Sequence, residues 1–134
     1  MGRVNPVVSL ALFIGVVFSG AVSAHHSVQA EYDVSGKRVT VQGAVAKIEF
    51  LNPHSYLTVN VKDAEGKITK WGFELGGVGK LRAAGISRAD RGGLKVGDEV
   101  TATALPARNG SSNGYLLELK MSDGREFKFT TEQN

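Results

Sequence analysis

Apolar and polar residues alternate along most of the chain from residue 37 onward, and a period of two is typical of half-buried β-strands. The first predicted strand changes phase at Gly43. Before this glycine the apolar residues occupy odd positions, and after it they occupy even positions: Val39 and Val41, then Ala44, Ala46, Ile48 and Phe50. A buried face that switches at a glycine predicts a bulge or a sharp bend, which lets one long strand serve both halves of a small barrel.

Five more segments carry the same alternation and are separated by turn-forming residues. They are residues 57–61, 67–75, 98–104, 117–121 and 127–129. Residues 78–84 have the composition of a short helix that stops at Gly85. The dipeptide Asp123-Gly124 predicts a tight hairpin between the last two strands. The resulting order, β-β-β-α-β-β-β, predicts an all-β fold with one short helix, a small OB-like Greek-key β-barrel of five to six strands.

The N-terminal 24 residues have the features of a cleaved signal peptide. Arg3 precedes an uncharged apolar run over residues 7–22, and Val22-Ser23-Ala24 places small or short residues at a cleavage site after Ala24. An uncleaved membrane anchor is the competing interpretation, but this run of 16 residues is shorter than the roughly 20 that span a bilayer comfortably. The prediction is a secreted protein with no membrane contact after cleavage.

The predicted organisation is then a signal peptide over residues 1–24, an arm over 25–36, a barrel over 37–130 and a frayed tail over 131–134. Cleavage leaves 110 of the 134 residues, with 15 Lys and Arg against 13 Asp and Glu because Arg3 is the only charged residue removed. A nearly neutral chain without a dense basic stripe argues against nucleic acid as a partner. The absence of cysteine excludes a disulfide framework, a thiolate zinc site and a cysteine nucleophile. A monomer is expected.

Five motifs together resemble a family of small secreted bacterial proteins of unknown function. They are His25-His26-Ser27, Asn52-Pro53-His54, Trp71-Gly72-Phe73-Glu74-Leu75-Gly76, Leu94-Lys95-Val96-Gly97-Asp98-Glu99-Val100 and Ser122-Asp123-Gly124-Arg125. The resemblance covers about residues 25–127. It implies a bacterial periplasmic barrel and carries over no activity, because the family has none established.

All three histidines lie in two places, at the predicted mature N-terminus and in the turn after the first strand. After cleavage, His25 offers both an α-amine and an imidazole to one metal ion, His54 offers an opposing imidazole, and His26 is an auxiliary ligand. Nitrogen ligands of this kind favour Cu(II), the tightest-binding divalent ion of the first row, over Zn(II). The arrangement resembles the histidine brace of copper-dependent polysaccharide monooxygenases and periplasmic copper carriers. The sequence therefore predicts copper binding or delivery.

The competing interpretation of these histidines is structural, with His25 and His26 in a mobile terminus and His54 hydrogen-bonded within its turn. No catalytic residue is predicted, and a copper-dependent oxidase or oxygenase is the lesser possibility because no extended substrate-binding face is evident. Glu31 and Asp33 could supply carboxylates near the arm, although acidic residues before a strand are more often solvated.

A metal-free alternative is a binding module for a periplasmic protein or a glycan, because OB-like barrels bind ligands on the face of strands two and three. Trp71 and Phe73 share a strand face with Leu75 and are expected in the core. Lys70 and Glu74 fall on the opposite face. This leaves Tyr56 and Lys70 as the candidate partner-binding residues.

Overall fold

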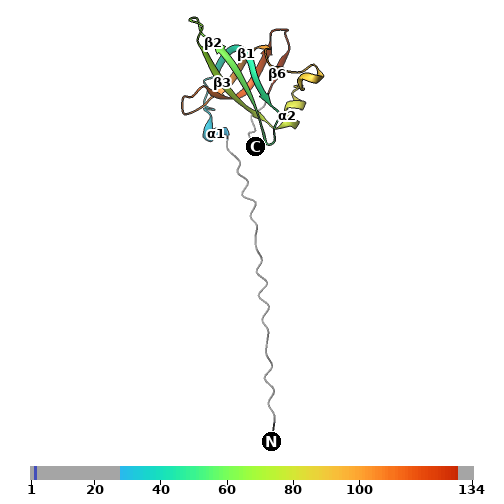
Figure 1. The fold of residues 1–134 in the computed structure, drawn as a ribbon. Helices are drawn as coiled ribbons and strands as arrows, with labels where there is room; N and C mark the ends of the chain where they lie inside the picture. Colours follow the sequence, from blue (N-terminus) through green and yellow to red (C-terminus); the bar gives the residue numbers. More distant parts are fainter. Residues whose placement is uncertain (1, 3–27, 130–134) are drawn as a thin grey trace.

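The computed structural model describes Gly2 and residues 28–129, and it confirms the predicted fold class. Five strands form a closed mixed β-barrel, a sixth strand lies outside it, and two short helices complete the chain (Figure 1). No helix among these residues has the length and apolar character needed to cross a membrane. The predicted cleavage site, His25, His26 and the predicted tail lie outside the described residues.

The order of elements follows the prediction, with one additional short helix at the start. The elements are α1 (Val28–Glu31), β1 (Val39–Glu49), β2 (His54–Lys62), β3 (Ile68–Gly76), α2 (Val78–Ala83), a 3-10 turn (Ala89–Arg91), β4 (Glu99–Pro106), β5 (Asn113–Met121) and β6 (Glu126–Lys128). β4 ends later than predicted and β5 begins earlier than predicted, so the polar loop between them is shorter. The predicted helix after the third strand is confirmed as α2.

The strands are hydrogen-bonded in the order β3-β2-β1-β4-β5-β6, and a parallel pairing of β3 with β5 closes the barrel. β1 pairs antiparallel with both β2 and β4, so this long strand contributes to both halves of the barrel. Closure gives each of the five barrel strands a hydrogen-bonded neighbour on both sides, and β6 extends the sheet on β5 alone. The connection through α2 joins β3 to β4, which are not neighbours.

The barrel interior is filled by the alternate apolar residues of the strands and by one residue of α2. The largest fully buried side chains include Leu57, Phe73, Leu75, Leu116 and Leu119, together with Leu81 from α2. Trp71 packs against this core and stacks on Phe73 with ring centroids 6.0 Å apart. The predicted core location is confirmed for Phe73, whereas Trp71 is only partly buried.

The phase change in β1 was predicted at the wrong residue. Val45 is the buried residue of this stretch, and the pairing with β2 shifts between Val45 and Lys47, which places the bulge at Ala46. Gly43 has a different role, because a Cβ at this position would lie 2.1 Å from the backbone oxygen of Asn60. The glycine therefore permits a close approach of β1 to β2.

The alternation over residues 117–121 predicts that Leu117 and Leu119 share the inward face of the fifth strand. For Leu117 this prediction is wrong. The pairing of β4 with β5 shifts next to Ala104, and Leu116 becomes the fully buried residue while Leu117 is only partly buried. Leu117 instead packs against a second, smaller apolar cluster formed by Tyr32, Leu105 and Tyr115. This cluster lies where the N-terminal segment contacts the barrel.

Candidate functional site

A buried carboxylate on the outer wall of the barrel is the centre of the candidate site. Glu74 of β3 lies between two core residues and therefore faces away from the barrel interior, yet only 9% of it is exposed. The Tyr32 hydroxyl donates to its Oε2 at 2.7 Å, and His54 Nδ1 lies 2.8 Å from its Oε1. We call Tyr32, His54 and Glu74 the carboxylate cluster.

The β2–β3 hairpin brings His54 and Glu74 to the same face. Tyr56 pairs directly with Glu74, and His54 pairs with Gly76 one step further along the outer face. The turn before β2 is held from two sides. Ser55 donates to and accepts from the backbone of Leu51, while the Asn52 side-chain oxygen accepts the Val78 N–H at 2.9 Å. These contacts fix the start of β2 and therefore the position of the imidazole.

The imidazole of His54 is buried on one side and accessible on the other. Its Nδ1 atom is buried and makes no hydrogen bond of good geometry, although the distance to Glu74 is that of an ion pair. The side chain as a whole is 28% exposed. A carboxylate beside Nδ1 favours a proton on that nitrogen, which leaves the free electron pair on Nε2. This is the orientation that a carboxylate gives to a metal-binding histidine.

The N-terminal segment is fastened to the barrel beside this cluster. The Asp33 N–H donates to the Pro106 carbonyl, the Arg108 N–H donates to the Glu31 carbonyl, and Arg108 Nε donates to the Gln29 carbonyl, all at 2.9 Å. The Tyr32 ring also contacts Tyr115, with centroids 5.8 Å apart. Residues 28–33 thus form part of the folded domain and end directly over Glu74.

Burial is the main cause that raises the pKa of the Tyr32 hydroxyl well above its ordinary value, and the hydrogen bond to Glu74 adds to it. Tyr32 is therefore a neutral donor at physiological pH. Burial and the charge of Glu74 also raise the pKa of Tyr56. By contrast, hydrogen bonds from Ser35 hold the pKa of Asp33 below its usual range. The Asp33 carboxylate is thus engaged in its own turn.

Of the predicted metal ligands, the structure places His54 in the cluster, whereas His25 and His26 lie outside the described residues. Within residues 28–129 no three His, Asp or Glu side chains come together as a metal site. A metal at His54 therefore requires ligands from elsewhere in the chain. Glu31 lies close enough to contribute to the raised pKa of both Tyr32 and Tyr56.

The predicted partner-binding residues share the outer face of β2 and β3 but do not meet. Tyr56 is 43% exposed and lies opposite Glu74, whereas Lys70 lies opposite Asn60. Four residues of strand separate these two positions of β3, which is roughly 13 Å. Tyr56 adjoins the carboxylate cluster, and Lys70 does not.

Two members of the cluster, Tyr32 and Glu74, were missed from the sequence as site residues. The strand alternation placed Glu74 correctly on the outer face, but it predicts a solvated carboxylate. Counting residues outward from the turn at 63–66 would have set Glu74 opposite Tyr56 and next to His54. No comparable local signal links Tyr32 to Glu74, because that contact joins residues 42 positions apart.

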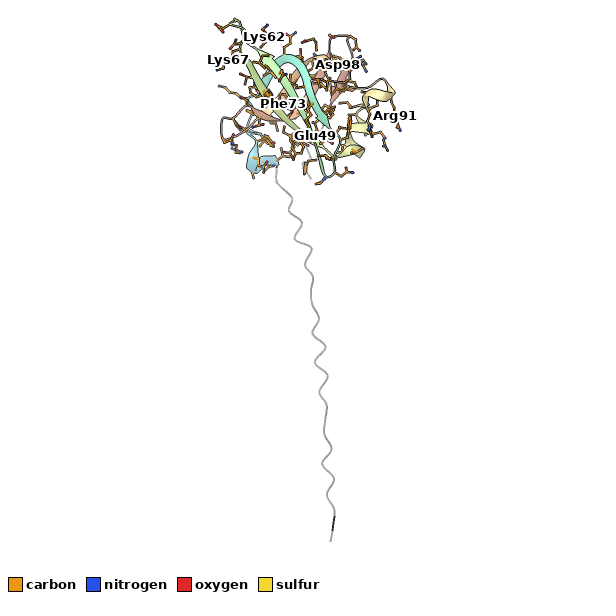
Figure 2. All side chains as sticks on the ribbon, viewed as in Figure 1. Glu49, Lys62, Lys67, Phe73, Arg91 and Asp98 are labelled. Carbon is orange, nitrogen blue, oxygen red and sulfur yellow. The ribbon has the colours of Figure 1, made fainter. Side chains whose placement is uncertain are left out.

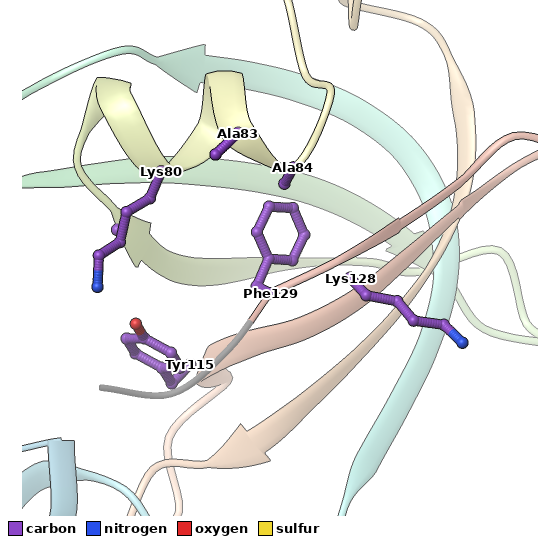
Figure 3. A pocket seen from close by; sticks show the side chains of 7 residues that line it. Lys80, Ala83, Ala84, Tyr115, Lys128 and Phe129 are labelled. Carbon is purple, nitrogen blue, oxygen red and sulfur yellow. The ribbon is translucent and has the colours of Figure 1, made fainter. Parts of the chain in front are cut away.

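A separate hollow of about 230 Å³ lies between α2 and residues 128–129 (Figure 3). The Phe129 ring lies below Ala83 and Ala84, and Lys80 and Tyr115 lie at one side of the hollow. One of its lining residues, Phe129, is the last residue that the structure describes. The hollow supports no assignment of a ligand.

The fold and the cluster define a small OB-like barrel protein with a polar site on its outer wall. A model of DUF6152, a family of unknown function, matches residues 14–117. Because the match spans more than half of the sequence, the chain belongs to this family. No curated protein and no solved structure matches the chain significantly. The expectation of a family without a known function is confirmed.

Proposed function

We propose that this chain is an exported periplasmic protein that binds Cu(II) through His54 and the histidines of its mature N-terminus. The contact between His54 Nδ1 and the buried carboxylate of Glu74 is the observation that carries the proposal. A metal-ligating histidine characteristically directs its second ring nitrogen to such a carboxylate, which fixes the ring and raises its basicity. His54 Nε2 is then the ligand atom.

The anchored N-terminal segment supports the participation of His25 and His26. Val28 packs against the apolar cluster that contains Tyr32, and Tyr32 donates to the same carboxylate as His54 contacts. Each residue of chain spans at most about 3.6 Å. The Cα atoms of residues 25 and 26 therefore cannot lie further than about 11 Å from that of Val28. The proposal requires the N-terminal ligands to reach His54 within this span.

The chemistry of these ligands favours copper. Processing after Ala24 gives His25 an α-amine beside its imidazole, and His54 supplies a third nitrogen. Cu(II) exceeds the other divalent first-row ions in affinity for nitrogen ligands, and it accepts a nearly planar set. In this proposal the protein binds or delivers the ion, and Glu74 and Tyr32 position His54 without touching the metal.

The test is a Cu(II) titration, against a competing chelator, of protein exported and processed so that residue 25 is the N-terminus. Mass spectrometry of the purified protein establishes the cleavage site. We expect tight one-to-one binding that is lost in His54→Gln and in a chain with one extra residue before His25. Electron paramagnetic resonance of the copper complex should report nitrogen ligands from His54 and from residue 25. Weak binding that neither change affects would overturn the proposal.

Glu74→Gln provides a second test, since the positioning role predicts weaker copper binding without loss of a ligand. Removal of an outer partner of this kind lowers metal affinity by roughly 10–100-fold. The matched control is Glu49→Gln. Glu49 of β1 lies opposite Tyr56 of β2 and forms an ion pair with Lys47 at the surface. Equal affinities of the two variants would argue against a role for the carboxylate. A protein without copper affinity would return attention to a partner-binding surface around Tyr56 and Lys70.

A further inference from the structure

A second surface, distinct from the carboxylate cluster, is formed by two adjoining hollows between the end of β1 and the segment that follows α2. Their volumes are about 400 Å³ and 440 Å³. Both are lined by Phe50 and Arg88, so they form one continuous groove. None of its lining residues belongs to the carboxylate cluster. Figure 2 shows Arg91 at this side of the barrel, away from the β2–β3 hairpin tip with Lys62 and Lys67.

The charge of this groove is one-sided. Arg82, Arg88 and Arg91 line the first hollow, and Lys47 and Lys95 line the second, whereas no acidic residue whose side chain the structure describes lines either one. Lys47 forms an ion pair with Glu49. In the part of the chain that the structure describes, no carboxylate pairs with the three arginine side chains, all of which are exposed. Three guanidinium groups are therefore available to an incoming anion.

Beneath the charges the groove is apolar. Phe50, Val78 and Ile86 line the first hollow, and Ile48, Leu94 and Val96 line the second. Val96 is 67% exposed and adds apolar surface to the second hollow. An occupant of this groove must therefore offer negative charges at its edges and apolar groups towards the floor.

We infer that this groove binds an acidic peptide segment that carries apolar side chains. Guanidinium groups match carboxylates geometrically with two parallel hydrogen bonds, and an arginine loses less rotamer freedom per bond than a lysine. The two connected hollows suit an extended chain whose apolar side chains occupy successive depressions. A bilayer surface fits less well, because the apolar residues line two hollows, whereas a lipid surface is flat.

The probe is a fluorescein-labelled peptide of sequence Gly-Glu-Glu-Phe-Glu-Glu-Leu-Glu-Gly, and its binding to the purified protein is followed by fluorescence polarisation. We expect saturable binding that weakens with added salt, because the contacts at the edge are ionic. A peptide with glutamine at every glutamate should bind at least tenfold more weakly. A peptide with glycine in place of phenylalanine and leucine should bind at least fivefold more weakly.

The double variant Arg88→Gln with Arg91→Gln should bind the acidic peptide at least tenfold more weakly than the unchanged protein. The matched control is Lys62→Gln with Lys67→Gln, which removes the same charge at the hairpin tip and should change affinity less than twofold. Circular dichroism confirms that both variants are folded. Equal weakening in the two double variants, or no peptide binding at all, would overturn the assignment. Binding to phosphatidylglycerol vesicles that requires both arginines, without peptide binding, would overturn it in favour of a lipid surface.

Discussion

Replacing Tyr32 by phenylalanine removes one oxygen atom from the centre of the carboxylate cluster. The Tyr32 hydroxyl donates to Glu74 Oε2 at 2.7 Å, and both residues are less than 10% exposed. The phenylalanine ring can keep the contact with Tyr115 and the packing against Leu105. The substitution therefore isolates the hydrogen bond that joins the N-terminal segment to the barrel wall.

The expected loss follows from the chemistry of this bond. A hydrogen bond to a charged group contributes roughly 1.5–3 kcal/mol to stability, and the unpaired carboxylate oxygen that remains is also costly. We expect Tyr32→Phe to lower the free energy of unfolding by about 2 kcal/mol. For a domain of this size, roughly 4 °C in Tm corresponds to each kcal/mol, so the midpoint should fall by about 8 °C.

Urea and thermal unfolding followed by circular dichroism measure this loss, and Tyr56→Phe is the control. Tyr56 lies directly opposite Glu74 and is 43% exposed, so the loss of its hydroxyl should change stability by less than about 0.5 kcal/mol. A double-mutant cycle with Glu74→Gln then isolates the coupling between Tyr32 and Glu74. If Tyr32→Phe were as neutral as Tyr56→Phe, the idea that this bond fastens the segment would be refuted.

Four further substitutions test separate parts of the fold. Gly43→Ala should prevent soluble expression or lower Tm strongly, because the new Cβ would lie 2.1 Å from the backbone oxygen of Asn60. The control is Gly79→Ala in α2, which has open space around it and should stabilise the folded protein by roughly 0.5–1 kcal/mol in the same thermal melts. Ser55→Ala should cost about 1–3 kcal/mol in urea unfolding, because this fully buried hydroxyl bonds two backbone groups of the preceding turn. Hydrogen bonds within its turn hold the pKa of Asp123 below its usual value, so its ionised form stabilises the fold above the unfolded pKa and this contribution disappears as the pH falls through the folded pKa. Asp123→Asn should therefore lower Tm at pH 7 and leave it unchanged near pH 2, as thermal melts at both values would show.

The architecture was predictable because several kinds of local signal agreed. Alternating residues marked the strands, the turn at Asp123-Gly124 marked the last hairpin, and residues 78–83 form the predicted helix. The connection order then left few ways to close the barrel. Consistent local signals of this kind restrict a chain to one fold.

Local details of the strands were not predictable in the same way. Ala44 and Ala46 are small, so their apolar character says little about which face is buried, and the larger Val45 takes the interior position. Likewise, Leu116 and Leu117 are adjacent leucines, and only the pairing with β4 decides which of them enters the core. A bulge shifts the register by one residue, and small or repeated apolar residues do not reveal where this happens.

The carboxylate cluster was only partly predictable because it depends on a long-range contact. His54 was selected from its residue type and its turn, and Glu74 was placed on the correct face of its strand. The burial of Glu74 arises from Tyr32, which belongs to a segment that looks polar and irregular in the sequence. Hydrophobic periodicity describes single elements, whereas this site forms where the N-terminal segment crosses the β2–β3 hairpin.

The proposed function would give Glu74 a role that stability alone does not. A buried ion pair or charged hydrogen bond is often no more stabilising than apolar residues of similar volume, since burial removes the charges from water. The outer wall of the barrel would tolerate apolar residues of similar volume at this position. Instead one carboxylate contacts both the imidazole of His54 and the hydroxyl of Tyr32, so the same group orients the imidazole and anchors the segment that leads to His25 and His26. Glu74→Gln should accordingly weaken both copper binding and the attachment of the N-terminal segment, whereas a purely structural carboxylate would affect the attachment alone.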